Sequence, residues 1–274
     1  IDEGLVGSEM CIRDSLNTNT VLKVVDILNQ ITIPPNNRRI NDFYEFDNLV
    51  YISTNYGISI YDMQSLEFGD TYYIGFNGTQ TRVHQITLNN NEIYAATSDG
   101  LKKANLNNPN LIDFQFWQTP FLGDFLSVIS IADQVFTIKS DNILYAVNDN
   151  SLSPVLSFTE PILRLEPNEN NFSIITANKV YYYQEDLSLL SSYNNSPDLN
   201  TTFTTSKIFN DIIYIGTLGS GMLKTSNNSN DLYEKIIPNG PLRNNPFSLH
   251  FGYGDLWVTF GDYDEDFNPN PNRE

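Results

Sequence analysis

One short pattern recurs along the chain and limits the folds that are open to it. Each copy is a mostly apolar, strand-like segment around an aromatic residue, and successive copies follow at intervals of 43, 42, 36, 42 and 43 residues. The aligned aromatic residues are Tyr51, Tyr94, Phe136, Phe172, Tyr214 and Trp257. A period of about 40–45 residues with about four strands per unit and no helical pattern is typical of β-propeller blades. Because one such sheet cannot bury both of its faces, the blades are expected to stack side by side around an axis.

The clearest copy, residues 91–102, predicts a β-hairpin. Its residues alternate at the strand period of two and then reach Ser-Asp-Gly, where Gly100 is expected to supply the positive φ of a tight turn. Two weaker copies place Asn142 and Asn178 where the others have glycine, and asparagine also tolerates the left-handed region. The other copies are residues 49–58, 212–221 and 255–261.

Each unit is expected to have a first strand before this hairpin and an outer strand after it, such as residues 69–74. The predicted first strands are residues 38–46, 81–88, 125–131, 162–167, 203–209 and 246–251. Turn-forming segments rich in proline, asparagine and glycine separate the units. The predicted fold is therefore all-β: a partial β-propeller over residues 16–274, with about six four-stranded units of a seven-bladed ring. Residues 20–33 are expected to form a strand of a preceding unit.

Residues 1–15 are interpreted separately from the repeats. They resemble a translated sequencing-adapter remnant, so we exclude them from the predicted fold; a genuine N-terminal tail is the alternative. They contain Cys11, the only cysteine of the chain, so the repeats have no disulfide, thiol nucleophile or cysteine-based zinc site. The start at Ile1 without a signal peptide suggests a fragment of a longer protein.

The charge balance excludes some classes of partner. The 274 residues include 33 acidic and 15 basic ones, for a formal net charge of −18. Such a chain is not expected to bind nucleic acid or an anionic membrane through a basic face. No apolar run approaches the roughly 18–20 residues of a transmembrane helix, so no membrane span is predicted.

Two histidines are the first candidates for chemistry. His84 and His250 occupy similar places in the first strands of the second and sixth units. We expect hydrogen-bonded strand histidines rather than ligands, because neither a His-x-x-x-His pair nor a carboxylate cluster accompanies them. The segment 262–266 has acidic residues at calcium-loop spacing, but Phe267 stands where an EF-hand has glycine and Arg273 where it has glutamate. A solvated acidic loop is the favoured interpretation.

The remaining candidates are a serine and several aromatic residues. Ser220 lies between two glycines in a predicted hairpin turn, not between a strand and a helix, so it does not form a nucleophile elbow. Trp117, Tyr193 and Tyr263 could stack on sugar rings with help from nearby amides, but packing in the blade core is the favoured interpretation. No catalytic, cofactor-binding or metal-binding residue is predicted, and no cofactor.

Several segments near the two ends of the repeats carry a family resemblance. They are residues 21–27, 33–36, 50–54, 56–62, 66–72, 238–241 and 255–258. Together they resemble the N-terminal propeller of the PorZ family, which belongs to the type IX secretion system of Bacteroidota. The resemblance spans roughly residues 20–271 and is weakest around residues 150–200. The hairpin pattern alone is shared with periplasmic sensor propellers of hybrid two-component regulators.

The resemblance implies a non-enzymatic, cell-surface protein of an attachment complex. Its implied partners are the sortase-like PorU, the outer-membrane proteins PorV and PorQ, and the anionic lipopolysaccharide to which cargo is joined. Two alternatives stay open: a ligand-sensing propeller of a hybrid two-component regulator, and a polysaccharide-active propeller enzyme. The enzyme would need convergent carboxylates, or a His/Tyr pair, with shifted pKa values at one mouth of the channel.

Overall fold

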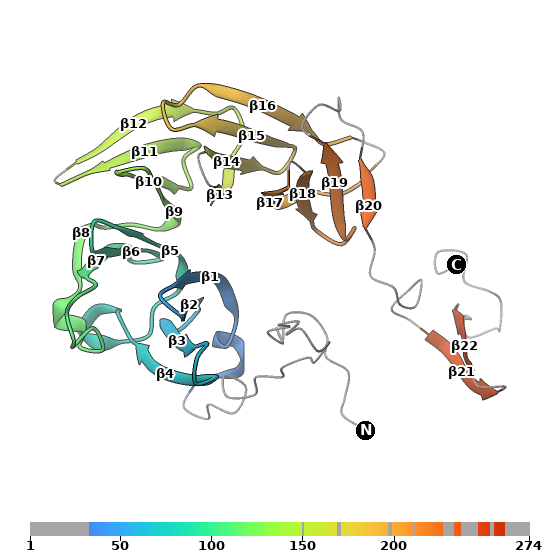
Figure 1. Cartoon of the computed structure of the whole chain (residues 1–274), viewed down its shortest axis with the longest axis horizontal. Coiled ribbons are helices and arrows are strands. Elements are labelled where there is room, and N and C mark those ends of the chain that lie inside the picture. Colours follow the sequence, from blue (N-terminus) through green and yellow to red (C-terminus); the bar gives the residue numbers. More distant parts are fainter. Residues whose placement is uncertain are drawn as a thin grey trace. The chain divides into compact units, whose positions relative to one another are not determined.

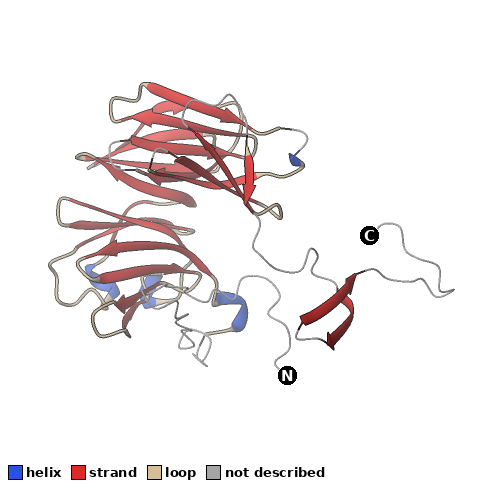
Figure 2. Ribbon diagram, turned by 45° about the vertical axis from the view of Figure 1, so that its right-hand side comes forward, coloured by secondary structure: helices blue, strands red, loops and turns tan. Residues whose placement is uncertain are grey.

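The described part of the chain is built almost entirely from β-strands joined by turns, with short 3₁₀ helices between some of them (Figure 2). This computed structural model describes residues 33–149, 151–168, 171–196, 199–210, 212–226, 233–236, 246–252 and 255–260. The chain divides into two units, Ile1–Lys235 and Ile236–Glu274. The predicted tail over residues 1–15 and most of the predicted strand over residues 20–33 lie outside the described residues.

The first unit contains five blades, each an antiparallel sheet whose four strands are paired in chain order (Figure 1). Blade 1 consists of β1 (Ile40–Phe46), β2 (Leu49–Thr54), β3 (Ile58–Asp62) and β4 (Glu67–Tyr72). Blade 2 consists of β5 (Val83–Asn89), β6 (Glu92–Thr97), β7 (Gly100–Asn105) and β8 (Gln118–Phe121). Blade 3 consists of β9 (Phe125–Ile131), β10 (Gln134–Lys139), β11 (Ile143–Asn148) and β12 (Ser151–Ser157).

Blade 4 consists of β13 (Ile162–Pro167), β14 (Asn171–Thr176), β15 (Lys179–Gln184) and β16 (Leu189–Asn194). Blade 5 consists of β17 (Phe203–Phe209), β18 (Ile212–Thr217), β19 (Met222–Ser226) and β20 (Glu234–Ile236). The 3₁₀ helices are η1 (Pro35–Asn37), η2 (Phe76–Gly78) and η3 (Phe114–Phe116). In the second unit, β21 (Pro246–Gly252) pairs with β22 (Asp255–Phe260) as an antiparallel hairpin. The five described four-stranded sheets confirm the predicted β-propeller, and the hairpin matches the first two strands of the predicted sixth unit.

The first strands of successive blades pack against one another, so blades 1 to 5 are arranged around a common axis (Figure 1). Near its start, each first strand shifts its register against the second strand by one residue. The residue that follows the shift is polar in every blade. We call this set the axial ring: Asp42, Gln85, Ser127, Arg164 and Thr205. A shift of this kind bends a strand and redirects its side chains, which here brings polar groups together at the axis.

Buried apolar side chains fill the spaces between neighbouring blades. Side chains on one face of a blade pack on the preceding blade, and those on the other face pack on the following one. Tyr51 packs on blade 2, and Phe136 packs on blade 4, where it stacks on Phe172 with ring centroids 5.6 Å apart. Each blade therefore supplies the cover that its neighbours lack, as the repeat predicts.

The predicted alignment of Phe172 with the other aromatic residues is wrong by one position. In the strand registers, Tyr51 pairs with Tyr44 and Phe136 with Ile129, and the equivalent residue of blade 4 is Ser173, which pairs with Glu166. Since side chains alternate faces along a strand, Phe172 points to the preceding blade. The Ser173 hydroxyl instead meets the Ser206 hydroxyl of blade 5, 2.9 Å away.

The turn glycine of the clearest copy has a different role from the predicted one. Gly100 has no positive φ, but a Cβ atom there would lie 2.4 Å from Thr119 Cγ2 and 2.9 Å from the Phe121 carbonyl oxygen. The close approach of β8 thus requires glycine. Asn142 has the predicted positive φ of 60°, whereas Asn178 does not have one.

Most predicted strand limits agree with the structure. The first strands of blades 3, 4 and 5 have the predicted limits, while β1 and β5 begin two residues later than predicted. The outer strand predicted over residues 69–74 is β4, displaced by two residues. Among the described residues, no helix is both long and apolar enough to cross a membrane. Whether residues 16–274 form part of one seven-bladed ring stays a prediction.

Candidate functional site

A cluster of charged side chains lies at the axis and joins blades that are not neighbours. The Arg164 guanidinium of β13 binds the carboxylates of Asp42 in β1 and Glu166 in its own strand. Its Nη1 also donates to the Asn41 carbonyl oxygen over 3.3 Å. Thr205 of blade 5 donates to Glu166 Oε1 over 2.7 Å. This axial cluster therefore connects blades 1, 4 and 5.

Amide and hydroxyl groups continue the network through blades 2, 3 and 4. Gln85 Nε2 donates to the Leu165 carbonyl oxygen over 3.2 Å, and Gln85 Oε1 accepts from the Ser127 hydroxyl and from the Val128 backbone N–H. Ser127 in turn accepts from the Leu165 backbone N–H over 3.0 Å. These buried polar groups satisfy one another, which is the condition for a stable polar interior.

The axial cluster contains the two converging carboxylates that a glycoside-cleaving site would need. Both are engaged by Arg164, and only 14% of the Asp42 side chain and 12% of the Glu166 side chain are exposed. A general acid and its partner must reach a substrate in a cavity, with water or a sugar between them. Carboxylates bound to one arginine instead hold blades together, so the geometry does not favour the enzyme alternative.

The axial cluster predicts a stability that depends on pH. Burial raises the pKa of Asp42 from its ordinary value of 3.8 to about 6, against the opposing attraction of Arg164. Because the folded-state pKa lies above the unfolded one, this carboxyl stabilises the fold fully below about pH 4, and the contribution is lost as the pH rises through about 6. The variant Asp42→Asn cannot ionise. The unfolding free energy of the original chain minus that of the variant should therefore fall between pH 4 and pH 7.

Urea denaturation at several pH values measures this difference. The matched control is Asp47→Asn, which removes an exposed carboxylate in the turn between β1 and β2. Burial lowers the pKa of His84, but this residue is present in all three chains, so its effect cancels in the comparison. A difference that grows with pH would contradict the assignment.

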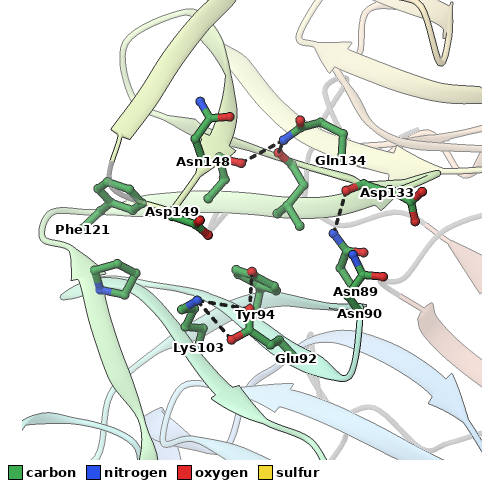
Figure 3. Close-up of a pocket in the computed structure, with 13 residues that line it drawn as sticks. Asn89, Asn90, Glu92, Tyr94, Lys103, Phe121, Asp133, Gln134, Asn148 and Asp149 are labelled. Carbon is green, nitrogen blue, oxygen red and sulfur yellow. Dashed lines mark hydrogen bonds and ion pairs between the residues drawn. The ribbon is translucent and has the colours of Figure 1, made fainter.

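A pocket of 440 Å³ lies between blades 2 and 3 (Figure 3). It lies at the end of these two blades where turns join the first strand to the second and the third strand to the fourth. We call it the blade 2–3 pocket; its lining residues are Asn89, Asn90, Glu92, Tyr94, Lys103, Pro120, Phe121, Asp133, Gln134, Val135, Val147, Asn148 and Asp149. The turn residues Asn90 and Asn91 have φ values of 48° and 61°, which asparagine tolerates and which brings the short turn to the edge of the pocket.

Three side chains of blade 2 form a network on one wall of the pocket. Lys103 Nζ donates to both oxygens of Glu92 over 3.1 Å, and the Tyr94 hydroxyl donates to Glu92 Oε2 over 2.7 Å (Figure 3). The lysine also lies 5.9 Å from the centre of the Tyr94 ring. Burial and the neighbouring Glu92 raise the pKa of Tyr94, so its hydroxyl stays protonated and donates.

The structure places the predicted candidates as follows. His84 is the residue skipped by the register shift in β5, and its Nε2 lies 3.4 Å from Asp124 Oδ1 without forming a regular hydrogen bond. Trp117 and Tyr193 are not exposed, since only 8% and 3% of their surfaces are accessible, and they pack in blade cores. The favoured interpretation, packing in the blade core, is therefore confirmed for these two residues. Tyr263 and the acidic segment 262–266 lie outside the described residues, as does the His250 side chain.

Neither location was predicted as a site from the sequence. The residues of each location come from more than one blade, and those of the pocket lie on six strands and three turns between residues 89 and 149. The axial ring does leave a signal: a polar residue two positions after the first apolar residue of each first strand. Among the described residues, no group of three or more His, Cys, Asp or Glu side chains is placed to hold a metal ion.

Comparisons with known proteins identify the kind of propeller. Residues 13–118 match the family "TSS9, PorZ, N-terminal beta-propeller domain". A solved structure of PorZ from Porphyromonas gingivalis resembles the chain with a TM-score of 0.67 and 17% identity, and the match covers 90% of this chain. This is a PorZ-like β-propeller. The chain spans 32% of the length of that PorZ structure. The comparison with curated protein sequences finds no match.

Two other solved structures share the fold of this PorZ-like propeller. The extracellular domain of the hybrid two-component system BT4673 of B. thetaiotaomicron has a TM-score of 0.56 and 14% identity, over 82% of this chain and 32% of that one. A chain of the Mitotic Checkpoint Complex has a TM-score of 0.53 and 12% identity, over 75% of this chain and 68% of that one. Functions this different on one architecture show that the fold alone does not specify a role.

Proposed function

We propose that this PorZ-like propeller is part of a non-enzymatic, cell-surface component of a type IX secretion system. The observation that supports this role is the match of residues 13–118 to the PorZ N-terminal propeller. The PorZ structure it resembles is described as an essential bacterial surface component of that system. The propeller would serve as a scaffold in the attachment complex, next to PorU, PorV and PorQ, and would recognise anionic lipopolysaccharide while cargo is anchored.

Deleting the parent gene tests the secretion role. Cargo that carries a C-terminal secretion signal should then keep the signal and fail to reach the cell surface. Reintroducing the parent gene should restore cleavage and anchoring. Normal processing of cargo in the deletion strain would contradict the role.

The charge of the chain determines how lipopolysaccharide would be bound. A net charge of −18 repels a polyanion, and this repulsion extends over about 8 Å at physiological ionic strength. Divalent cations can bridge carboxylates and phosphates, so retention of the chain on immobilised lipopolysaccharide should require calcium or magnesium and should be lost with a chelator. Strong retention at low salt without divalent cations would contradict this expectation.

A sensor propeller is the second candidate function. The similarity to the extracellular domain of BT4673 is the observation that favours it, with a lower TM-score than that of PorZ. The gene sequence that follows the codon for Glu274 separates the two. A second propeller would support the secretion role, whereas an immunoglobulin-like domain followed by a membrane helix and a kinase would support the sensor.

A further inference from the structure

We infer that the blade 2–3 pocket binds a cationic ligand that carries hydroxyl groups, of the aminosugar class. This inference goes beyond the proposed secretion role and does not depend on it. The pocket volume of 440 Å³ lies within the range of about 300–1,000 Å³ found for small-molecule sites. The hydrogen-bonding groups, the charge and the apolar residues of the lining indicate the class of ligand.

Several hydrogen-bond donors around the pocket are directed to groups of the protein itself. Lys103 and the Tyr94 hydroxyl both donate to Glu92. Gln134 Nε2 donates over 2.9 Å to the carbonyl oxygens of Val135 and Val147. A phosphate or carboxylate needs donors, and it would have to break these contacts to obtain them.

The same contacts leave acceptors for a ligand. Asn89 Nδ2 donates to the Asp133 carbonyl oxygen over 3.1 Å, and in Gln134 both contacts use the amide nitrogen (Figure 3). Amide and carboxylate oxygens can each accept further hydrogen bonds. The pocket therefore suits a ligand that is rich in donors, such as hydroxyl and ammonium groups.

The charge of the lining favours a cation. Glu92, Asp133 and Asp149 are acidic, and Lys103 is the one basic residue among those that line the pocket. Lys103 is paired with Glu92, so the two further acidic residues, Asp133 and Asp149, leave the lining with a net negative charge. An ammonium group within about 4 Å of a carboxylate is attracted even in water, and more strongly in a partly buried pocket.

The apolar part of the lining favours a sugar ring over a simple amine. Pro120 and Phe121 of β8 and the buried Val135 of β10 contribute apolar atoms to the lining. The C–H face of a sugar can pack on an aromatic or proline ring while its hydroxyl groups reach the acceptors. Together these groups match an aminosugar better than an anionic sugar or a peptide ammonium.

Calorimetric titration of the 274-residue chain with four probes tests the inference. Glucosamine is expected to bind at least about tenfold more tightly than glucose, and glucose 6-phosphate should show no saturable binding. Lysine amide supplies the ammonium group without the ring and should bind more weakly than glucosamine. Equal or tighter binding of glucose 6-phosphate, tighter binding of lysine amide, or no binding of glucosamine would overturn the inference.

A charge-matched pair of variants assigns the binding to the pocket. The double variant Asp133→Asn/Asp149→Asn should weaken glucosamine binding at least about tenfold. The control Asp47→Asn/Asp70→Asn removes two exposed carboxylates of blade 1 and should change the affinity less than about twofold, because distant exposed charges are screened. Urea denaturation checks that both variants fold as the original chain does. An equal loss in the two variants would assign the effect to net charge and overturn the site.

Discussion

The variant Arg164→Met is expected to unfold more easily than the original chain by about 3 kcal/mol, near the lower end of the range for breaking a buried ion pair. Methionine keeps the apolar stem and removes the charge, so Asp42 and Glu166 would face each other without their shared cation. The expected loss is at the lower end because 24% of the Arg164 side chain is exposed to water. Urea denaturation near pH 7 measures it.

Two further variants test the cause of this loss. Arg82→Met makes the same change at an exposed position and should shift the unfolding free energy by less than about 0.5 kcal/mol. Adding Asp42→Asn and Glu166→Gln to Arg164→Met should recover part of the lost stability, since neutral amides no longer require a cation. If the triple variant is no more stable than Arg164→Met, the loss comes from packing and not from unpaired charge.

The variant Phe172→Ala is expected to lose about 3–5 kcal/mol of unfolding free energy, because it leaves a cavity between blades 3 and 4. Phe172 is fully buried and stacks on Phe136 of the preceding blade and on Tyr183 of its own. The matched control is Phe76→Ala, where 79% of the side chain is exposed and a change below about 0.5 kcal/mol is expected. Comparable losses in the two variants would contradict the described packing.

A double-mutant cycle with Phe172→Ala also tests the corrected register of β14. Coupling with Phe136→Leu should be about 0.5–1.5 kcal/mol, as for other contacting aromatic pairs. Coupling with Phe203→Leu in blade 5 should be near zero, because Phe203 packs on the opposite face of blade 4. The reverse result would restore the alignment predicted from the sequence.

The sequence predicts the blades because both the two-residue alternation along a strand and the spacing of about 40 residues between repeats can be read directly from it. In blades 1 to 5, each hairpin copy covers the second strand and the turn toward the third, and the first strands of blades 3 to 5 agree in both limits. Residue type favours aligning Phe172 with the other aromatic residues, whereas the register of β14 places Ser173 at that position. Because side chains alternate between the two faces of a strand, a shift of one residue moves every side chain to the opposite face.

Both candidate sites depend on relations between blades, which residues taken one at a time do not reveal. The axial cluster needs Asp42 and Arg164 on opposite sides of the axis, and the pocket needs the side of blade 2 against the turns of blade 3. Trp117 and Tyr193 illustrate the same dependence: polar residues nearby in the sequence are compatible with exposed rings, but packing in the blade cores buries both. Burial is set by the partner sheet rather than by adjacent residues.

The contact between Arg164 and Asp42 also constrains the order of folding. The two residues are 122 positions apart in the chain, so the ion pair cannot form until the intervening blades have been synthesised and have come together. Contacts with such large sequence separation are slow to form and tend to form late. Until then, a nascent chain carries Asp42 without its cation, and blade 1 gains this part of its stability only when blade 4 arrives.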